Sequence, residues 1–406
     1  MRWLTPVVVY VLLKGILAFL LATIFTVAPL YRINEVGMKP LQLMLVGMVL
    51  EAAAFLFEIP TGIVADTYSR KLSIIIGVCL MGVASVLEGL VPVLGPILVA
   101  QAIWGIGFTF TSGATDAWMV DEIGEERSRQ AFVRAAQIAQ IGTLVGIVFG
   151  TGLGSMQLNL PIWVGGFLMI GLGLLLIIIM PETGFHPTPH PERSSWEQMR
   201  RTFVTGTQAI RTRPILITIL TVGTIVGASG EGLDRLWQYH FETSFRFPTV
   251  GELTPIIWFG MISVMATLLS IVAAERINRH MSEITDRSIA RTLLVIDSMR
   301  LVSILLFALA GNFFLAIAAF CTTSALRTIN GPLYAVWLNR NIPSSVRSTV
   351  LSMNGQIDSL GQIAGGPVFG AIGNVSIRLA IGVVGLVIGP ALALYWRTAY
   401  TKKKAL

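Results

Sequence analysis

The ten residues GIVADTYSRK (62–71) join two long apolar segments of the chain, which cover roughly residues 41–63 and 72–91. An α-helix rises about 1.5 Å per residue, so about 20 apolar residues cross a hydrocarbon core about 30 Å thick. Each of the two segments has that length. The charged residues between them are therefore predicted to form a short polar loop that connects two membrane-spanning helices.

Ten further apolar segments are separated by polar or turn-forming residues. They cover roughly residues 7–30, 96–120, 131–155, 160–180, 214–236, 253–274, 288–310, 312–337, 348–372 and 375–396. The first is too long for the apolar core of a signal peptide, so we expect it to remain as a helix. The pattern predicts an all-α membrane protein with twelve transmembrane helices in two sets of six.

The composition excludes several classes of protein. Of the 406 residues, 54% are hydrophobic and 13% are charged, whereas about 25% are charged in a typical soluble domain. The two cysteines, Cys79 and Cys321, lie inside apolar segments, which does not support a disulfide framework. A water-soluble fold, a nucleic-acid binder and a secreted disulfide scaffold are therefore excluded.

Basic residues are distributed unevenly over the loops. If successive loops alternate between two sides, 21 of the 29 lysines and arginines fall on one side and 5 on the other, while Lys14, Arg300 and Arg327 fall inside segments. Cytoplasmic loops are enriched in lysine and arginine. We therefore expect both termini in the cytoplasm, in a multi-pass protein of the cell (inner or plasma) membrane.

The stretch from Pro181 to Arg213 is the long polar interval of the chain. It predicts a six-helix bundle over residues 1–180, a cytoplasmic linker over 181–213 and a second six-helix bundle over 214–406. Within the linker, Ser194 followed by Glu197 is typical of a helix N-terminus. The linker then holds either an interfacial helix on the membrane surface or a plain solvated chain.

The two halves share a repeat. At an offset of 219 residues, six positions match, and they are Trp118, Ile123, Gln137, Ile138, Gly142 and Gly146 against Trp337, Ile342, Gln356, Ile357, Gly361 and Gly365. The match runs in the same direction in both halves. Parallel repeats of this kind occur in secondary transporters whose halves rock about a central site. The alternative is a chance similarity between apolar helices.

The loop GIVADTYSRK (62–71) resembles the signature loop of the major facilitator superfamily, which has glycine, then aspartate, then arginine and lysine at this spacing between helices 2 and 3. The resemblance implies the major facilitator fold, with two parallel six-helix bundles. It also implies a cytoplasmic latch, and the loop's glycine would let helices approach closely. The alternative is a plain loop with cytoplasmic positive charge. The residues of the expected latch are Gly62, Asp66, Arg70, Lys71, Asp116 and Asp121.

Other short stretches resemble the bacterial drug and siderophore exporters of this superfamily. They are FEIPTG (57–62), SGATDAW (112–118) and DRLW (234–237). Glycines every four residues from Gly142 to Gly154 resemble the fifth-helix motif of drug antiporters, although the proline usual there is absent and a Gly-Gly-Pro stands instead at 365–367. Gln101 stands where the antiporter pattern has an arginine. Proton coupling is therefore expected from carboxylates inside the membrane.

Ionisable residues at membrane depth cost about 2.5–3.5 kcal/mol each on insertion scales, so each needs a partner or a task. Glu51 and Glu58 lie seven residues apart on the second segment, and Lys14 lies at an intermediate depth on the first. Lys14 can pair with either carboxylate. The three residues form either a protonation switch that couples transport to protons or a static salt bridge.

The second half contains two further charged groups. Asp297, Arg300, Arg327 and Asp358 all lie about 9–12 residues from the cytoplasmic ends of their segments, so we expect one neutral network, mainly structural, with Arg327 near the cavity. The other group lies at the extracellular end of the seventh segment. It is either an outer gate or a solvated helix end, and it consists of Glu231, Asp234 and Arg235.

Aromatic side chains offer candidates for a substrate cavity, because exporters of amphipathic compounds bind them in flexible apolar sites. Most aromatics in such chains only pack helices or anchor them at the interface. The candidates are Trp104, Phe108, Trp118, Trp258 and Trp337.

Alternative functional classes lack their motifs. A phosphate-binding loop of the Gly-x4-Gly-Lys-Ser/Thr type is absent, and the four histidines do not cluster as metal ligands. We therefore expect a secondary active transporter, not an enzyme, that exports small amphipathic or hydrophobic drug-like compounds in exchange for protons, as in multidrug efflux and antibiotic resistance. The alternatives are proton-coupled uptake, siderophore or metabolite transport, and a receptor that transports nothing. The expected partners are a small-molecule substrate, protons and lipid. We expect a monomer with no cofactor, no metal and no nucleic acid.

Overall fold

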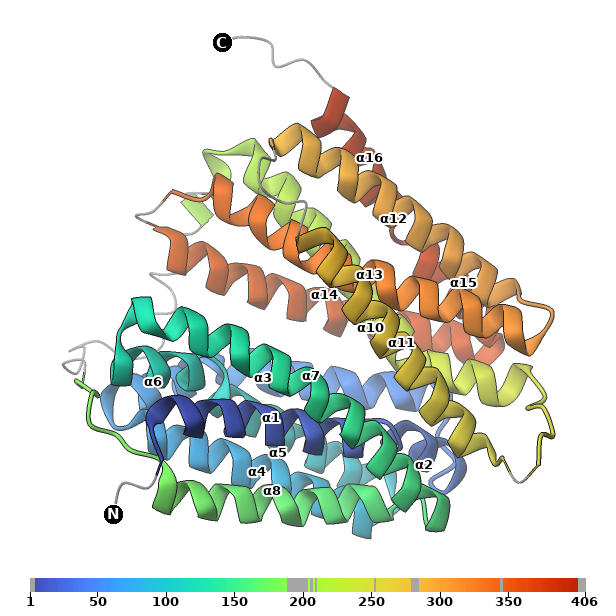
Figure 1. Cartoon of the computed structure of the whole chain (residues 1–406). Coiled ribbons are helices and arrows are strands. Elements are labelled where there is room, and N and C mark those ends of the chain that lie inside the picture. Colours follow the sequence, from blue (N-terminus) through green and yellow to red (C-terminus); the bar gives the residue numbers. More distant parts are fainter. Residues whose placement is uncertain are drawn as a thin grey trace. The chain divides into compact units, whose positions relative to one another are not determined.

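The computed structural model describes residues 4–187, 204, 207–208, 210–251, 253–278, 285–343 and 346–400. In these ranges the chain is helical and forms no strand (Figure 1). The first group of helices is α1 (Pro6–Phe25), α2 (Ala28–Asn34), α3 (Pro40–Thr67), α4 (Arg70–Leu90), α5 (Leu94–Thr111), α6 (Ala114–Ile123), α7 (Glu125–Met156) and α8 (Leu160–Ile179). The second group is α10 (Pro214–Ser244), α11 (Pro255–Asn278), α12 (Asp286–Leu309), α13 (Phe313–Asn341), α14 (Arg347–Val375), α15 (Ile377–Leu386) and α16 (Gly389–Tyr400).

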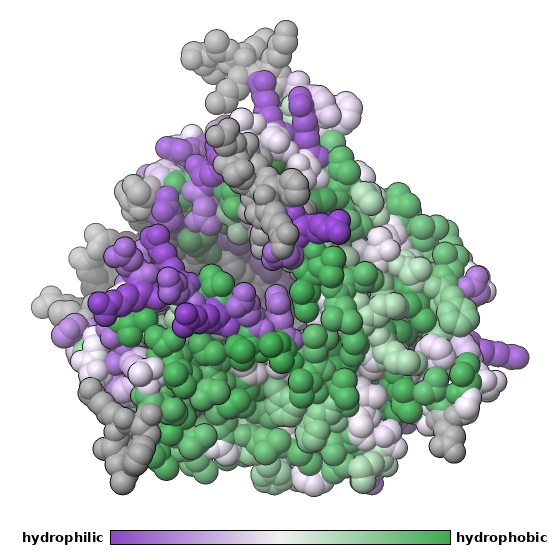
Figure 2. Space-filling model, viewed as in Figure 1, coloured by the Kyte–Doolittle hydropathy of each residue, from purple (hydrophilic) through white to green (hydrophobic). Residues whose placement is uncertain are grey.

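Eleven stretches of helix in the described part of the chain are long and apolar enough to cross a membrane. The predicted segment that is not among these eleven covers residues 348–372 and lies in α14, a helix of 29 residues that carries Asn354, Asp358 and Gln362 and is therefore less apolar. Figure 2 shows hydrophobic side chains over much of the helical surface, with hydrophilic ones gathered near the start of α7. On α8, Leu174, Leu175, Ile177 and Ile178 are exposed. Exposed apolar faces of this kind suit contact with lipid.

Helix starts follow from local sequence. Proline occupies the first position of α1, α3, α10 and α11, where its missing N–H costs nothing. The α4 helix begins after Ser69, whose hydroxyl accepts a hydrogen bond from the Leu72 backbone N–H at 2.9 Å. These signals place the helix boundaries at the polar breaks between apolar segments.

The helices form two compact units. Unit 1 consists of residues 1–38, 49–199 and 249–261, and unit 2 of residues 39–48, 200–248 and 262–406. The first residues of α3 therefore belong to unit 2, and the first residues of α11 belong to unit 1. The interfacial helix predicted from Ser194 lies outside the described residues.

Within unit 1, α1 packs closely against α7 along the glycines spaced by four. A methyl group at Gly142, Gly146 or Gly150 would overlap a backbone oxygen of α1. The Thr23 hydroxyl also donates to the Gly146 carbonyl oxygen at 3.3 Å. The prediction of a small-residue face for helix packing is confirmed.

Unit 2 repeats the helix pairings of unit 1 in the same order. The pairs α1 with α7, α4 with α5 and α4 with α8 in unit 1 recur as α10 with α14, α12 with α13 and α12 with α15 and α16 in unit 2. A methyl group at Gly361 would press on the Thr224 carbonyl of α10, as one at Gly142 would press on α1. The parallel repeat therefore extends from the sequence to the packing.

The fourth predicted segment is interrupted. The α5 helix ends at Thr111 and α6 starts at Ala114, and Gly113 between them has a φ of 69°. Glycine adopts this left-handed conformation without steric cost. The break leaves Ser112 and Gly113 outside regular helix geometry, and the Ser112 side chain and the first turn of α6 both contribute to the candidate site.

Candidate functional site

A half-exposed ion pair lies inside unit 1. The Lys14 ammonium is 2.7 Å from Asp116 Oδ1, and the Tyr10 hydroxyl donates to the same oxygen at 2.8 Å. Asp116 lies in the first turn of α6, where the positive end of the helix dipole favours a carboxylate. In this structure Lys14 pairs with Asp116, which the α5–α6 break brings to it, whereas the sequence analysis expected Glu51 or Glu58 as its partner.

Glu58 lies near the same break and is half-buried. The Ser112 hydroxyl donates to its Oε1 at 3.3 Å. Within the described ranges its carboxylate forms no ion pair. Glu51, two turns earlier on α3, is also half-buried. Since a carboxyl group at membrane depth requires a counter-charge or a proton, Glu58 with its neutral partner is suited to hold a proton.

A second half-exposed ion pair lies inside unit 2. Arg327 Nη1 is 2.5 Å from Asp234 Oδ1, and the two side chains are 43% and 49% exposed. The corresponding values for Lys14 and Asp116 are 33% and 57%. All four residues belong to helices that can span a membrane. Charged groups in membrane-spanning helices face the bundle interior or a water-filled cavity, so we expect both pairs to face away from lipid.

The α10 helix provides a glycine face for the polar groups of unit 2. Side chains at Gly223, Gly227 and Gly230 would collide with Tyr334, Asp358 and Arg327 respectively, which come from α13 and α14. These three polar side chains thus lie in a row along α10.

Further hydrogen bonds hold this row in place. The Tyr334 hydroxyl donates to Asn354 Oδ1 at 2.7 Å. The Gln362 amide donates to Asp358 Oδ2 at 2.9 Å. The row is therefore a polar surface that carries the Asp358 carboxylate and the Arg327 guanidinium. Asp234 adds a second carboxylate beside Arg327.

The expected outer-gate residues are not at a helix end. The α10 helix continues to Ser244, about 13 Å beyond Arg235 at 1.5 Å per residue. Arg235 Nε is 2.7 Å from Glu231 Oε1 within this helix, and Glu231 is buried. The solvated-end alternative is therefore wrong, and Asp234 belongs with Arg327 rather than with its neighbours on α10.

The network predicted for the second half is two groups, not one. Asp297 Oδ1 is 2.8 Å from Arg300 Nη1, and Asp297 Oδ2 accepts hydrogen bonds from Asn330 and Tyr395, both at 2.9 Å. Asp297, Arg300 and Tyr395 are almost completely buried. Helix rotation explains the error, because residues at one depth can face different neighbours. Arg327 and Asp358 lie on the α10 row instead.

Unit 1 contains a similar buried group that the sequence analysis missed. Arg32 Nε is 2.7 Å from Glu88 Oε1, and the Gln101 amide donates to Glu88 Oε2 at 2.6 Å. All three residues are at most 3% exposed. Gln101 occupies the antiporter-arginine position, so the cation near that position is Arg32. Glu88, a carboxylate inside an apolar segment, was the signal that could have revealed this group.

One histidine lies inside a helix. His240 belongs to α10, and it is completely buried. Its Nε2 is 3.1 Å from the Phe307 carbonyl oxygen and its Nδ1 is 3.0 Å from the Ser244 hydroxyl. In the part of the chain that the structure describes, no group of three potential metal ligands occurs.

Three of the expected latch residues, Arg70, Asp66 and Asp121, lie together, and Asp116 lies apart from them. Arg70 Nε is 2.8 Å from Asp121 Oδ2, and Arg70 Nη2 is 3.7 Å from Asp66 Oδ1. Asp116 does not join them, since it pairs with Lys14. A methyl group at Gly62 would touch none of the described residues, so the predicted close helix approach at this glycine is wrong.

Lys71 contributes through its backbone. Its N–H donates to Glu182 Oε1 at 2.8 Å, and the Ser69 hydroxyl donates to Glu182 Oε2 at 2.6 Å. Glu182 thus caps the start of α4. On the same stretch of chain, Glu122 accepts hydrogen bonds from the Thr183 and Gly184 backbone N–H groups. These two carboxylates, which the sequence analysis did not single out, attach the segment after α8 to the start of α4 and the end of α6.

The five aromatic candidates fall into different environments. Trp118 and Trp337 are buried in the packing of their units, with Trp118 Nε1 donating to the Pro181 carbonyl oxygen at 2.7 Å. Trp104 is 9% exposed and stacks on Phe108, which is 43% exposed. Trp258 is half-buried. The repeated tryptophans therefore pack the core, and Phe108 is the aromatic side chain of this set most open to a ligand.

The chain is similar in sequence and in fold to known membrane transporters. The model of the Major Facilitator Superfamily matches residues 11–353. In Bacillus subtilis (strain 168), the uncharacterized MFS-type transporter YxaM is 22% identical over 82% of this chain and 80% of its own length. Multidrug resistance protein 1 of the same organism is 21% identical over 82% and 81%. The crystal structure of the nucleoside transporter NupG matches with a TM-score of 0.77 and 12% identity, covering 98% of this chain and all of that one.

Proposed function

The chain belongs to the major facilitator superfamily and is a membrane transporter, and we propose that it exports small amphipathic or hydrophobic compounds in exchange for protons. The observation that carries this proposal is the occurrence of half-exposed ion pairs at membrane depth in both units. These pairs supply the solvent-accessible charged groups that a transport path needs. The named multidrug relative supports the substrate class.

The proposed proton carrier is Glu58, with Glu51 as the second candidate. The Glu58 carboxylate accepts a hydrogen bond from the Ser112 hydroxyl, which carries no charge. When the site is closed to water, desolvation favours the neutral, protonated form of this carboxyl group. Loss of that proton leaves a negative charge near the α5–α6 break. An amphipathic substrate with a cationic group can then replace the proton, and one conformational cycle exchanges the two.

Lys14 and Asp116 form the proposed switch beside this carrier. Their ion pair neutralises both charges while Glu58 holds its proton. When Glu58 is ionised, the carboxylates of Asp116 and Glu58 both attract the Lys14 ammonium group. Movement of Lys14 between them would link the charge of Glu58 to the geometry of α1 and α6.

Each unit contains its own proposed substrate-contacting residues. Phe108 stacks on Trp104 with ring centroids 5.8 Å apart, and Phe25 packs against Trp104 edge-on. In unit 2, Arg327, Asp234 and Asp358 provide the polar row along α10.

The remaining proposals concern architecture and orientation. We place a first bundle at residues 1–180, a cytoplasmic linker at 181–213 and a second bundle at 214–406, in a single subunit of the cell membrane with both termini in the cytoplasm. The excess of basic residues in one set of loops supports this orientation. Arg70, Asp66 and Asp121 then form the cytoplasmic latch.

Accumulation of a fluorescent amphipathic cation in cells that express the protein tests the direction of transport. We expect lower accumulation than in cells with the Glu58→Gln variant, and collapse of the difference when a protonophore removes the proton gradient. Higher accumulation with the wild type would indicate uptake. Unchanged accumulation over a broad panel of amphipathic compounds would refute drug export.

A further inference from the structure

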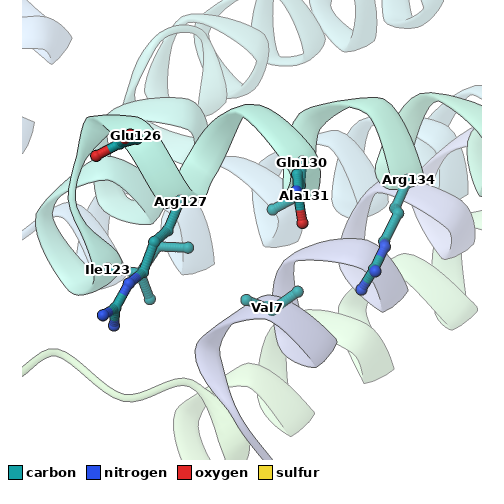
Figure 3. Close-up of a pocket in the computed structure, with 7 residues that line it drawn as sticks. All are labelled: Val7, Ile123, Glu126, Arg127, Gln130, Ala131 and Arg134. Carbon is teal, nitrogen blue, oxygen red and sulfur yellow. The ribbon is translucent and has the colours of Figure 1, made fainter.

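A cavity of about 460 Å³ lies at one end of unit 1, where α1 starts, α6 ends and α7 starts. Val7 from α1, Ile123 from α6 and Ala131 from α7 form its apolar lining. Its polar lining comes from the first three turns of α7 (Figure 3). None of these residues belongs to the transport site described above.

Two arginines dominate the polar lining. Arg127 and Arg134 are seven residues apart, which is two helical turns, so they lie on one face of α7. Figure 3 shows both side chains extending toward the side on which Val7 lies, with Gln130 between them. Glu126 also lines the cavity, but its carboxylate points away from the Arg127 guanidinium in the same view.

No acidic side chain in the described part of the chain neutralises these arginines. Across the described ranges, neither Arg127 nor Arg134 forms an ion pair with a carboxylate, whereas Arg129 pairs with Glu125 at 3.8 Å. Both lining arginines are exposed. Even with Glu126 counted, the cavity lining carries a net positive charge. Arginine binds phosphate oxygens through paired N–H donors, so the cavity is suited to a phosphate group.

The place of the cavity selects the source of that phosphate. Val7 is the second residue of α1 and Arg127 the third of α7, and both helices belong to stretches that can span a membrane. The cavity is therefore at headgroup depth, where lipid phosphates are concentrated. Its apolar lining suits the first carbons of an acyl chain. We infer that this cavity binds the phosphate group of an anionic membrane lipid, which contacts α1 and α7 together.

Thermal unfolding of the full-length protein in detergent tests this site. Phosphatidylglycerol added to the micelles should raise the unfolding midpoint of the wild type by about 2–4 °C at saturation. The double variant Arg127→Gln, Arg134→Gln should show no rise. Arg129→Gln is the matched control, because it removes one arginine of the same helix that is paired elsewhere, and it should keep the full rise.

The comparison lipids identify the ligand. Phosphatidylcholine and inorganic phosphate should each produce a smaller shift than phosphatidylglycerol. An equal shift with inorganic phosphate would assign the cavity to a free anion and overturn the inference, and an equal shift with phosphatidylcholine would remove its charge selectivity.

The double variant Arg127→Gln, Arg134→Gln can fail to fold, so a second measurement uses a variant that keeps the positive charge. Native mass spectrometry of the wild type and of Arg127→Lys, Arg134→Lys should detect retained phosphatidylglycerol on both, because lysine keeps the charge. Equal retention by the glutamine double variant, or equal loss in Arg129→Gln, would contradict the site.

Discussion

Each unit contains a buried ion pair and a half-exposed ion pair, and the two kinds differ in their surroundings. The buried pairs, Arg32–Glu88 and Arg300–Asp297, are at most 4% exposed, and side-chain amides or hydroxyls complete the hydrogen bonding of their carboxylates. In the half-exposed pairs, Lys14–Asp116 and Arg327–Asp234, each side chain is at least 33% exposed. The difference separates charges that hold helices together from charges that water, protons or a ligand can reach.

The largest expected effect comes from breaking a buried pair. Asp297→Ala leaves the Arg300 guanidinium without its counter-charge in a dry site, which costs about 3–5 kcal/mol. We expect a strong fall in the unfolding midpoint in detergent, together with low expression. A change below about 1 kcal/mol would show that Arg300 finds another partner.

A matched control distinguishes lost charge balance from lost packing. The double variant Asp297→Leu, Arg300→Met removes both charges at similar volume, and such replacements are often neutral. It should recover most of the stability that Asp297→Ala loses. Failure to recover would indicate that Asn330 and Tyr395 depend on the carboxylate more than Arg300 does.

A half-exposed pair should respond in the opposite manner. Asp234→Asn should change the unfolding free energy by less than about 1 kcal/mol, because exposed ion pairs contribute little. Transport should nevertheless fall about tenfold or more, which corresponds to about 1.4 kcal/mol. The measurement is the initial rate of substrate transport in proteoliposomes at matched protein content. A large loss of stability with unchanged specific transport would place Asp234 among the structural charges.

The fold could be predicted from sequence, whereas the partners of individual charges could not. Segment lengths and the match at offset 219 depend only on composition and spacing, and the structural pairing of α7 with α1 and of α14 with α10 follows them. The partner of Lys14 depends on the break at Gly113, which lies within an apparently continuous apolar segment. Glycine in such a segment does not reveal its φ. Side-chain depth was therefore predictable, but helix rotation was not.

Arg32 and the repeated tryptophans illustrate the same limit. Arg32 follows the first predicted segment, which ends at residue 30, yet α2 continues to Asn34 and buries this arginine against Glu88. Trp118 and Trp337 were candidates for ligand contact, although both are core residues. A residue type that recurs at the repeat offset can be kept for packing as well as for binding.

The latch offers a smaller test of the same distinction. The Asp66 side chain is 60% exposed and lies 3.7 Å from Arg70, so Asp66→Asn should fold normally. We expect it to lose most transport, because it removes a charge that favours one conformational state. Rates measured beside those of Asp121→Asn, which faces Arg70 at 2.8 Å, would show which carboxylate matters more. Normal transport by Asp66→Asn would show that the loop only sets the orientation of the chain in the membrane.

Proton movement in proteoliposomes tests the central claim most directly. The protein is reconstituted with a pH-sensitive dye inside, and an amphipathic cationic substrate is added outside. We predict substrate-driven proton movement with the wild type and with Ser112→Ala, which keeps the carboxylate, and none with Glu58→Gln. Wild-type proton movement in both Glu58→Gln and Glu51→Gln would contradict coupling through α3 and would direct attention to Asp234 and Asp358.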